Sequence, residues 1–207
     1  GWAVPTRLIS DLHLDAERPQ LTEILVRFLQ GPAREAAALY LLGDVFEVWI
    51  GDDDTSALID TVASELAAVA RGGTHVYFMH GNRDFLVGEV FARRAGATLI
   101  TDPHVVHLGG IRTLLTHGDR YCTHETAYQA FRQQSRDPEW QAAVLAKPLE
   151  ERRALGKGMR AQSVIAQQAR LNAGYGLVDV DNAAALAFYD ILQWKTTNLI
   201  ALQKKRP

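Results

Sequence analysis

The stretch LYLLGDVFEVWIGDDD, residues 39–54, decides the fold that this sequence predicts. Its apolar start belongs to a run over residues 37–42, which has the length of a strand and ends directly at a Gly-Asp pair, residues 43–44. The same arrangement of a short apolar run followed by polar residues occurs at residues 4–13 and at residues 74–84. These runs predict three buried strands, each ending in polar side chains.

Helices are predicted between and after these strands, because apolar residues there recur at helical spacing. The helical stripes cover about residues 21–29, 58–69 and 85–95. Gly109-Gly110 then joins two further apolar runs, 105–108 and 111–116, into a predicted hairpin that ends at His117. Strands that alternate with helices, followed by a hairpin, predict a layered α/β fold of βαβ units with mixed sheets.

The pattern changes after the hairpin, where residues 123–170 show helical spacing alone. We therefore predict three parts: a core over 1–122, a helical cap insertion over 123–172, and a return to the core over 173–207.

Composition excludes several classes of function. Twenty-two Lys and Arg residues against 24 Asp and Glu residues leave a net charge of -2, which gives no general attraction to nucleic acid. The single cysteine, Cys122, excludes an internal disulfide, and no apolar run reaches the roughly 20 residues of a membrane-spanning helix. We expect a cytoplasmic protein whose membrane contact, if it has one, is peripheral.

Potential metal ligands follow four of the predicted strands. They are Asp11 and His13 after the first, Asp44 after the second, Asn82 after the third, and His117 after the hairpin. Carboxylates, amide oxygens and imidazoles are the ligands that Mn²⁺ and Mg²⁺ prefer, and a pair of such ions requires a bridging carboxylate, for which Asp44 is placed. Each residue alone is weak support, since a single D-x-H is common and a lone histidine is more often a hydrogen-bonded surface residue. Their order, each directly after a strand, favours a two-metal site where strand ends meet.

These motifs resemble those of the calcineurin-like metallophosphoesterases, whose patterns are D-x-H, G-D-x-x, G-N-x-[DE] and G-H. The matching residues are 11–13, 43–44, 81–84 and His117, the last in its own H-G-D context. Longer stretches are similar to one family within them, the UDP-2,3-diacylglucosamine pyrophosphatases of bacterial lipid A biosynthesis. These stretches are residues 39–54, HGNRDFL at 80–86, HGDRYCT at 117–123 and AYQAFR at 127–132.

The resemblance implies a hydrolase with the layered metallophosphoesterase fold and a helical cap. It implies hydrolysis of UDP-2,3-diacylglucosamine to UMP and 2,3-diacylglucosamine 1-phosphate, with two Mn²⁺ ions per chain, at the cytoplasmic face of the inner membrane. Two other functions remain open at this point. One is a metallophosphoesterase acting on other nucleotides, and the other is a metal-impaired protein that binds a nucleotide-linked lipid.

The resemblance also implies roles for individual residues. Asp11, His13 and Asp44 hold the first ion, while Asp44, Asn82 and His117 hold the second. Arg83 and Asn82 contact the phosphates, for which the planar fork of a guanidinium is suited. The cap is expected to bind substrate through Glu125, Ser163, Gln167 and Arg170. Two further acids, Asp84 and Asp119, are expected to orient the histidines.

A basic segment and the C-terminal stretch complete the sequence interpretation. Residues 147–170 contain six basic residues and two acidic ones, which suits either an anionic membrane surface or an ordinary solvated helix. All seven histidines precede residue 125, so the family's closing H-G-H-T-H-R-P motif is missing, with Gln203 and Lys205 at the two ligand positions. We expect either a C-terminal stretch that differs from the native one or an impaired metal site, and favour the first.

Overall fold

The computed structural model describes residues 4–123 and 126–172, with side chains as far as residue 161. Its main sheet has four parallel strands in the order β1-β2-β3-β4, and a separate antiparallel pair is formed by β5 and β6. The strands are β1 (Thr6–Ile9), β2 (Ala38–Leu42), β3 (His75–Met79), β4 (Ala97–Ile100), β5 (His104–Leu108) and β6 (Ile111–Leu115). The predicted layered α/β fold is confirmed.

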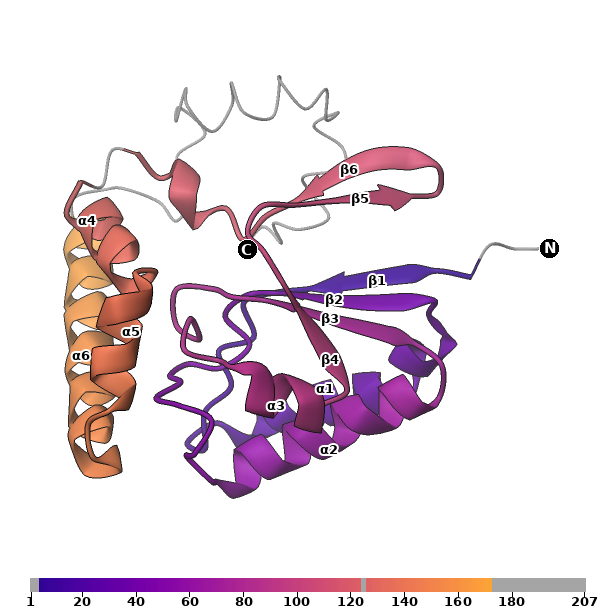
Figure 1. Cartoon of the computed structure of the whole chain (residues 1–207), viewed down its shortest axis with the longest axis horizontal. Coiled ribbons are helices and arrows are strands. Elements are labelled where there is room, and N and C mark those ends of the chain that lie inside the picture. Colours follow the sequence, from indigo (N-terminus) through magenta and orange to yellow (C-terminus); the bar gives the residue numbers. More distant parts are fainter. Residues whose placement is uncertain (1–3, 124–125, 173–207) are drawn as a thin grey trace.

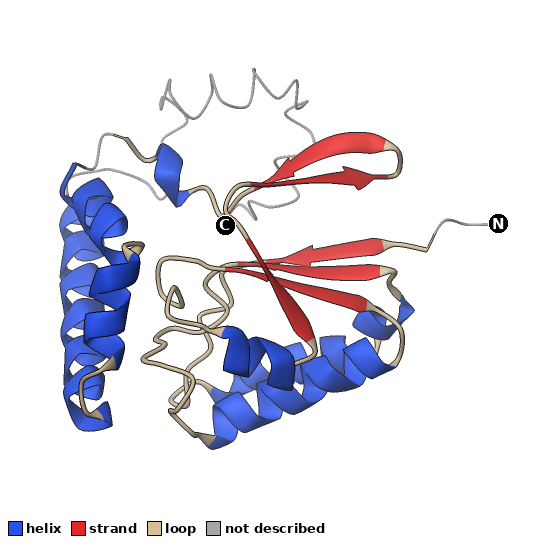
Figure 2. Ribbon diagram, viewed as in Figure 1, coloured by secondary structure: helices blue, strands red, loops and turns tan. Residues whose placement is uncertain are grey.

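This sheet is the middle one of three layers (Figures 1 and 2). One face is covered by helices, and the β5–β6 hairpin lies over the other face. The covering helices are α1 (Pro19–Gln30), α2 (Ala57–Arg71) and α3 (Glu89–Arg94), with short 3-10 turns at Pro32–Glu35 and Asp119–Tyr121. Because every crossover steps to the next strand in one direction, all three helices fall on the same face.

The central strands are buried on both faces, as their continuous apolar runs predict. Successive side chains of a strand point to opposite faces. Leu39 and Leu41 of β2 therefore join the core beneath the helices, while Tyr40 and Leu42 join the smaller core beneath the hairpin. The next strand follows the same rule, with Val76 and Phe78 on the helical side and Tyr77 and Met79 on the hairpin side.

Two features differ from the sequence prediction. The third helix starts at Glu89 rather than near Phe85, and β4 was not foreseen. Residues 85–87 are apolar but form a buried loop, because the Asp52 carboxylate accepts hydrogen bonds from the backbone N–H groups of Gly88 and Phe91 and so fixes where the helix begins. The strand β4 has only four residues, too few for a clear alternation pattern.

Three further helices, α4 (Thr126–Ser135), α5 (Pro138–Leu145) and α6 (Leu149–Asn172), lie together beside the loops at one end of the sheet (Figure 1). Asp137 caps α5 by accepting a hydrogen bond from the N–H of Trp140. The helical character predicted for this part of the chain is confirmed. Its treatment as a separate cap remains a prediction.

Helix α6 is fixed to the loop after β2 by ion pairs and close packing. Arg152 is buried, donates to the carbonyl oxygen of Ile50 (2.7 Å) and pairs with both carboxylate oxygens of Asp53. Arg153 pairs with Asp54 (3.0 Å). A Cβ added to Gly156 would lie 2.8 Å from Val48, so only a glycine allows the helix to approach this closely.

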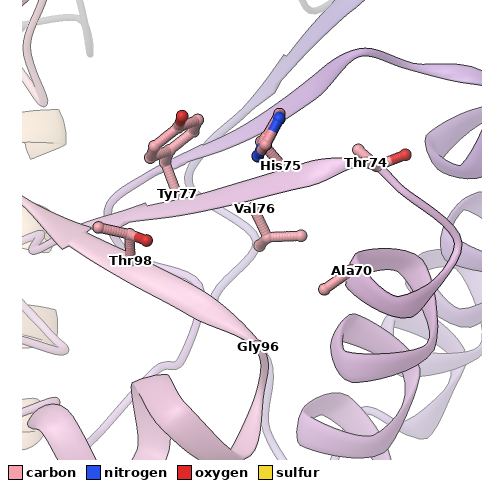
Figure 3. A pocket seen from close by; sticks show the side chains of 7 residues that line it. All are labelled: Ala70, Thr74, His75, Val76, Tyr77, Gly96 and Thr98. Carbon is pink, nitrogen blue, oxygen red and sulfur yellow. The ribbon is translucent and has the colours of Figure 1, made fainter.

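A shallow pocket lies at the amino ends of β3 and β4, the opposite end of the sheet from the loops described below (Figure 3). It is lined by Ala70, Thr74, His75, Val76, Tyr77, Gly96 and Thr98, none of which belongs to the predicted site.

Candidate functional site

Three loops at the carboxyl ends of β1, β2 and β3 are joined by backbone hydrogen bonds. The N–H of Asp11 donates to Gly43 O (3.0 Å), and the N–H of His13 donates to Asp44 O (2.9 Å). Asp11, His13 and Asp44 all have positive φ angles, of 55°, 48° and 54°. Side chains other than glycine adopt this conformation at an energetic cost, so the surrounding hydrogen bonds must hold it. The three strained residues are the predicted ligands of the first ion.

The buried Asp84 carboxylate joins the loop after β3 to the loop after β2. It accepts hydrogen bonds from the backbone N–H groups of Gly81 (2.7 Å), Asp44 (3.2 Å), Val45 (2.8 Å) and Phe46 (3.4 Å). A Cβ on Gly81 would lie 2.3 Å from the backbone nitrogen of Asp44, so the two loops touch at a position that only glycine allows. These four contacts are all to backbone, so Asp84 holds the two loops together. Its expected role in orienting a histidine stays a prediction.

The side chains of Asp11, His13 and Asp44 converge on one point. One ligating atom from each lies within 4.8 Å of the other two. His13 Nε2 is 3.9 Å from Asp11 Oδ1 and 3.8 Å from Asp44 Oδ2. Donors that are each about 2.1 Å from one ion lie about 3 to 4 Å apart, so this oxygen and nitrogen set fits a divalent cation.

Asp44 also reaches the predicted second position. Its Oδ2 lies 3.6 Å from His117 Nε2, while its Oδ1 accepts a hydrogen bond from the N–H of Arg83 (2.9 Å). His117 Nδ1 donates to Leu42 O (2.9 Å), which leaves Nε2 directed at Asp44. One carboxylate thus lies between the imidazoles of His13 and His117, as a bridging role requires.

Burial and charge shift the titration of these groups. Burial raises the pKa of Asp44 to about 6, although the imidazole of His117 partly opposes this shift. The contact with Glu47 raises the pKa of His13. Burial works against protonation of His117, but the Asp44 carboxylate and the Leu42 carbonyl together raise the pKa of that imidazole above its usual value. The negative charge at this site therefore favours bound cations.

Tyr128 of α4 is a site residue that the sequence interpretation missed. Its hydroxyl donates to Asp119 Oδ2 (2.7 Å) and also interacts with Asn82, and burial together with Asp119 raises its pKa. Asp119 further pairs with Arg132 Nε (3.0 Å). Asp119 thus binds a tyrosine and an arginine of α4, and its charge also helps to raise the pKa of His117. The expected role of Asp119 in orienting that histidine stays a prediction. Tyr128 belongs to the AYQAFR stretch that resembles the family, but the sequence near it does not indicate a contact with Asn82.

Relatives with known names match this chain. A UDP-2,3-diacylglucosamine hydrolase of Xanthomonas oryzae pv. oryzae is 54% identical over 169 residues, which cover 82% of this chain and 68% of the relative. Proteins of the same name from Hahella chejuensis and Cellvibrio japonicus are 47% identical over 167 residues and 52% identical over 158 residues. They cover 81% and 76% of this chain, and 68% and 66% of the relatives. The chain belongs to the UDP-2,3-diacylglucosamine hydrolase family. No family model matches it.

Membership of the UDP-2,3-diacylglucosamine hydrolase family confirms the resemblance drawn from the motifs. Several residues that were predicted to bind substrate or metal lie outside the part of the chain that the structure describes. Glu125 and residues 173–207, including Gln203 and Lys205, are not described. Ser163, Gln167 and Arg170 lie on α6, where only the backbone is described.

Three arginines of the basic segment, residues 147–170, fix α6 to the rest of the chain. Arg152 and Arg153 pair with Asp53 and Asp54, as described above, and Arg160 pairs with Asp15 (2.7 Å). These three arginines therefore face acids elsewhere in the chain. Among the described residues, no helix combines the length and the apolar character needed to cross a bilayer.

Proposed function

We propose that this chain hydrolyses the pyrophosphate bond of UDP-2,3-diacylglucosamine, giving UMP and 2,3-diacylglucosamine 1-phosphate for lipid A biosynthesis. The convergence of Asp11, His13 and Asp44 at the strand ends carries the proposal, because it provides a cation site where a diphosphate can be held. Relatives named for this substrate, at up to 54% identity, support the choice of substrate.

Two Mn²⁺ ions are proposed as the cofactors. Asp11, His13 and Asp44 would hold the first, and Asp44, Asn82 and His117 the second. Their carboxylate, amide and imidazole donors suit such ions, and the contacts of Asp44 with both imidazoles support a bridging role. Bound divalent metal supplies Lewis acidity and lowers the pKa of water toward neutrality.

The chain's own residues would bind and orient the substrate. Asn82 and Arg83 follow β3 directly, and the backbone N–H of Arg83 is fixed by Asp44. This anchor supports a role for the Arg83 guanidinium in binding a diphosphate oxygen. Residues 123–172 are proposed as the cap that binds the rest of the substrate, through Glu125, Ser163, Gln167 and Arg170.

A peripheral position on the cytoplasmic face of the inner membrane is proposed, since the substrate is a lipid. Leu145 and Leu155 are exposed large apolar side chains of α5 and α6, and Lys157 is exposed on α6. Exposed apolar residues beside a cation support contact with an anionic bilayer. Cosedimentation with anionic but not neutral vesicles is expected, and a Leu145→Ser/Leu155→Ser variant should bind less. Equal binding by this variant would contradict the proposed contact.

The test of the function is UMP release from UDP-2,3-diacylglucosamine with added Mn²⁺, compared with cleavage of an aryl phosphodiester. We expect a clear preference for the lipid substrate. Asp44→Ala should lose more activity than the roughly 10- to 100-fold typical of an outer-shell partner. Asp60→Ala is the matched control, because Asp60 pairs with Arg94 on α3, away from the site.

Two outcomes would contradict the proposal. Equal cleavage of both substrates would indicate a metallophosphoesterase of another specificity. Lipid binding without hydrolysis, together with less than one tightly bound Mn²⁺ per chain, would indicate a metal-impaired binding protein.

A further inference from the structure

Glu47, in the loop after β2, lies among four basic side chains. Its Oε2 is 3.1 Å from His13 Nδ1 and 3.5 Å from an Arg18 guanidinium nitrogen. Its Oε1 is 3.3 Å from Arg83 and 3.7 Å from Arg160. Only 12% of the Glu47 side chain is exposed, so solvent screens these contacts weakly. A nearly buried carboxylate is thus shared between His13 of the proposed metal site and three arginines.

The contact with His13 determines which ring nitrogen is free to bind a cation. A carboxylate beside Nδ1 keeps the proton on that nitrogen and leaves the lone pair on Nε2. Nε2 is the atom that faces Asp11 and Asp44. Arg18 adds a second restraint, because it donates to the backbone carbonyl of His13 (2.7 Å). The ring of His13 is therefore held through Nδ1, the nitrogen that does not face Asp11 and Asp44, and its backbone is held through the carbonyl oxygen.

The second oxygen of Glu47 acts on a different residue. Arg83 has its backbone N–H fixed by Asp44 and its guanidinium beside Glu47. Arg160 approaches the same oxygen from α6. One carboxylate therefore links the loop after β1, the loop after β3 and helix α6.

We propose that Glu47 is a positioning residue, which orients His13 for metal binding through one carboxylate oxygen and Arg83 for substrate binding through the other. This inference rests on the proposed function, because it assumes a cation at Asp11, His13 and Asp44. Glu47 lies within the stretch 39–54, but the sequence motifs gave it no role, because its partners come from other loops. It directly follows Phe46, which forms an isolated β-bridge with Leu14.

The experiment compares Glu47→Ala, Glu47→Gln and wild type by Mn²⁺ affinity, measured from the EPR signal of free Mn²⁺, and by the separate values of kcat and KM. Glu47→Ala is expected to weaken Mn²⁺ binding about 10- to 100-fold and to raise KM. Glu47→Gln should restore most of the Mn²⁺ affinity, because an amide oxygen beside Nδ1 also favours the proton on that nitrogen. It should keep the raised KM, because it lacks the charge that holds Arg83.

A control separates this effect from the loss of any paired carboxylate. Glu65→Ala removes a partly buried glutamate that contacts Arg34 (3.9 Å) and Gln30 (2.8 Å) on the helical face, and it should change neither value. Circular dichroism checks that each variant folds. Because glutamine nearly matches glutamate in shape, Glu47→Gln keeps the test informative if Glu47→Ala does not fold.

The two possible failures give different results. Mn²⁺ affinity and KM within twofold of wild type in both Glu47 variants, with Mn²⁺ binding lost in Asp44→Ala, would overturn the role of Glu47 alone. Mn²⁺ binding that Asp44→Ala leaves unchanged would instead contradict the proposed metal site.

Discussion

The carboxylate of Asp84 accepts a hydrogen bond from the backbone N–H of Asp44, 3.2 Å away. The two aspartates are buried side by side, but they do different work. Asp84 binds four backbone N–H groups, whereas the Oδ2 of Asp44 faces the imidazoles of His13 and His117. Asp84 therefore stabilises the loop conformation, whereas Asp44 directs its carboxylate toward the predicted metal site.

Replacing Asp84 by asparagine should therefore damage the fold of the site. The side-chain NH₂ group would face backbone donors, and two hydrogen bonds to a charged acceptor would be lost. At about 1.5 to 3 kcal/mol for each, Asp84→Asn should lower the free energy of unfolding by about 3 kcal/mol or more. Urea denaturation measures this loss.

Asp137→Asn is the control for that substitution. Asp137 caps α5 with a single hydrogen bond to the N–H of Trp140. Asparagine serves nearly as well as aspartate at such a position, so the free energy of unfolding should stay within about 0.5 kcal/mol. Equal losses in the two variants would contradict a special role for Asp84.

Two glycines of α6 test how closely this helix contacts the loop after β2. A Cβ on Gly156 would lie 2.8 Å from Val48 and 3.1 Å from Ile50, whereas a Cβ on Gly158 would meet nothing within 4 Å. Gly156→Ala should cost about 1 to 3 kcal/mol through overpacking. Gly158→Ala should stabilise the helix by about 0.5 to 1 kcal/mol. Thermal unfolding and hydrogen exchange of α6 distinguish the two, and similar behaviour would argue against this docking.

The ion pair between Asp53 and Arg152 should make stability depend on pH. The bidentate contact with Arg152 lowers the pKa of Asp53 below its usual value of 3.8. A lowered folded-state pKa stabilises the fold above the unfolded pKa, and this contribution is lost as the pH falls through the folded value. Asp53→Asn should therefore cost about 1 kcal/mol at pH 7, a small value because Asp53 is largely exposed.

The loss should shrink as the pH falls below about 4 and should vanish below the folded-state pKa of Asp53. Chemical denaturation of Asp53→Asn and wild type across this pH range measures it. Asp54→Asn breaks a single contact with the exposed guanidinium of Arg153 and should cost less at pH 7 than loss of the bidentate pair. A difference in stability that stayed constant with pH would contradict the ion pair as its cause.

Mn²⁺ should stabilise the protein by binding its folded state. At a free concentration 100 times the dissociation constant, the gain is about 2.7 kcal/mol, which corresponds to a rise in Tm of about 5 to 10 °C. EDTA should reverse the rise and Asp44→Ala should abolish it, while Asp60→Ala should keep it. A rise of the same size in Asp44→Ala would place the ion elsewhere. Differential scanning calorimetry gives the measurement.

The sequence alone determined every strand except β4, most of the helices and the residues predicted to be the central metal ligands. The apolar runs ending at Asp11, Asp44 and Asn82 were sufficient, because burial on both faces makes strand residues continuously apolar and parallel strands bring their carboxyl ends together. The pairing of Asp11 with His13 and Asp44 follows from that topology, and the structure places all three within 4.8 Å.

Only the tertiary structure decided which partners the remaining charged residues take. Glu47 meets Arg160, Asp53 meets Arg152, and Tyr128 meets Asn82 through contacts between segments far apart in the chain. Local patterns report the period of burial along one element, but they do not report which side chain of a distant loop will neutralise a given charge. Sequence patterns therefore determined where the predicted metal ligands lie, and the packing of loops and helices decided what holds these residues in place.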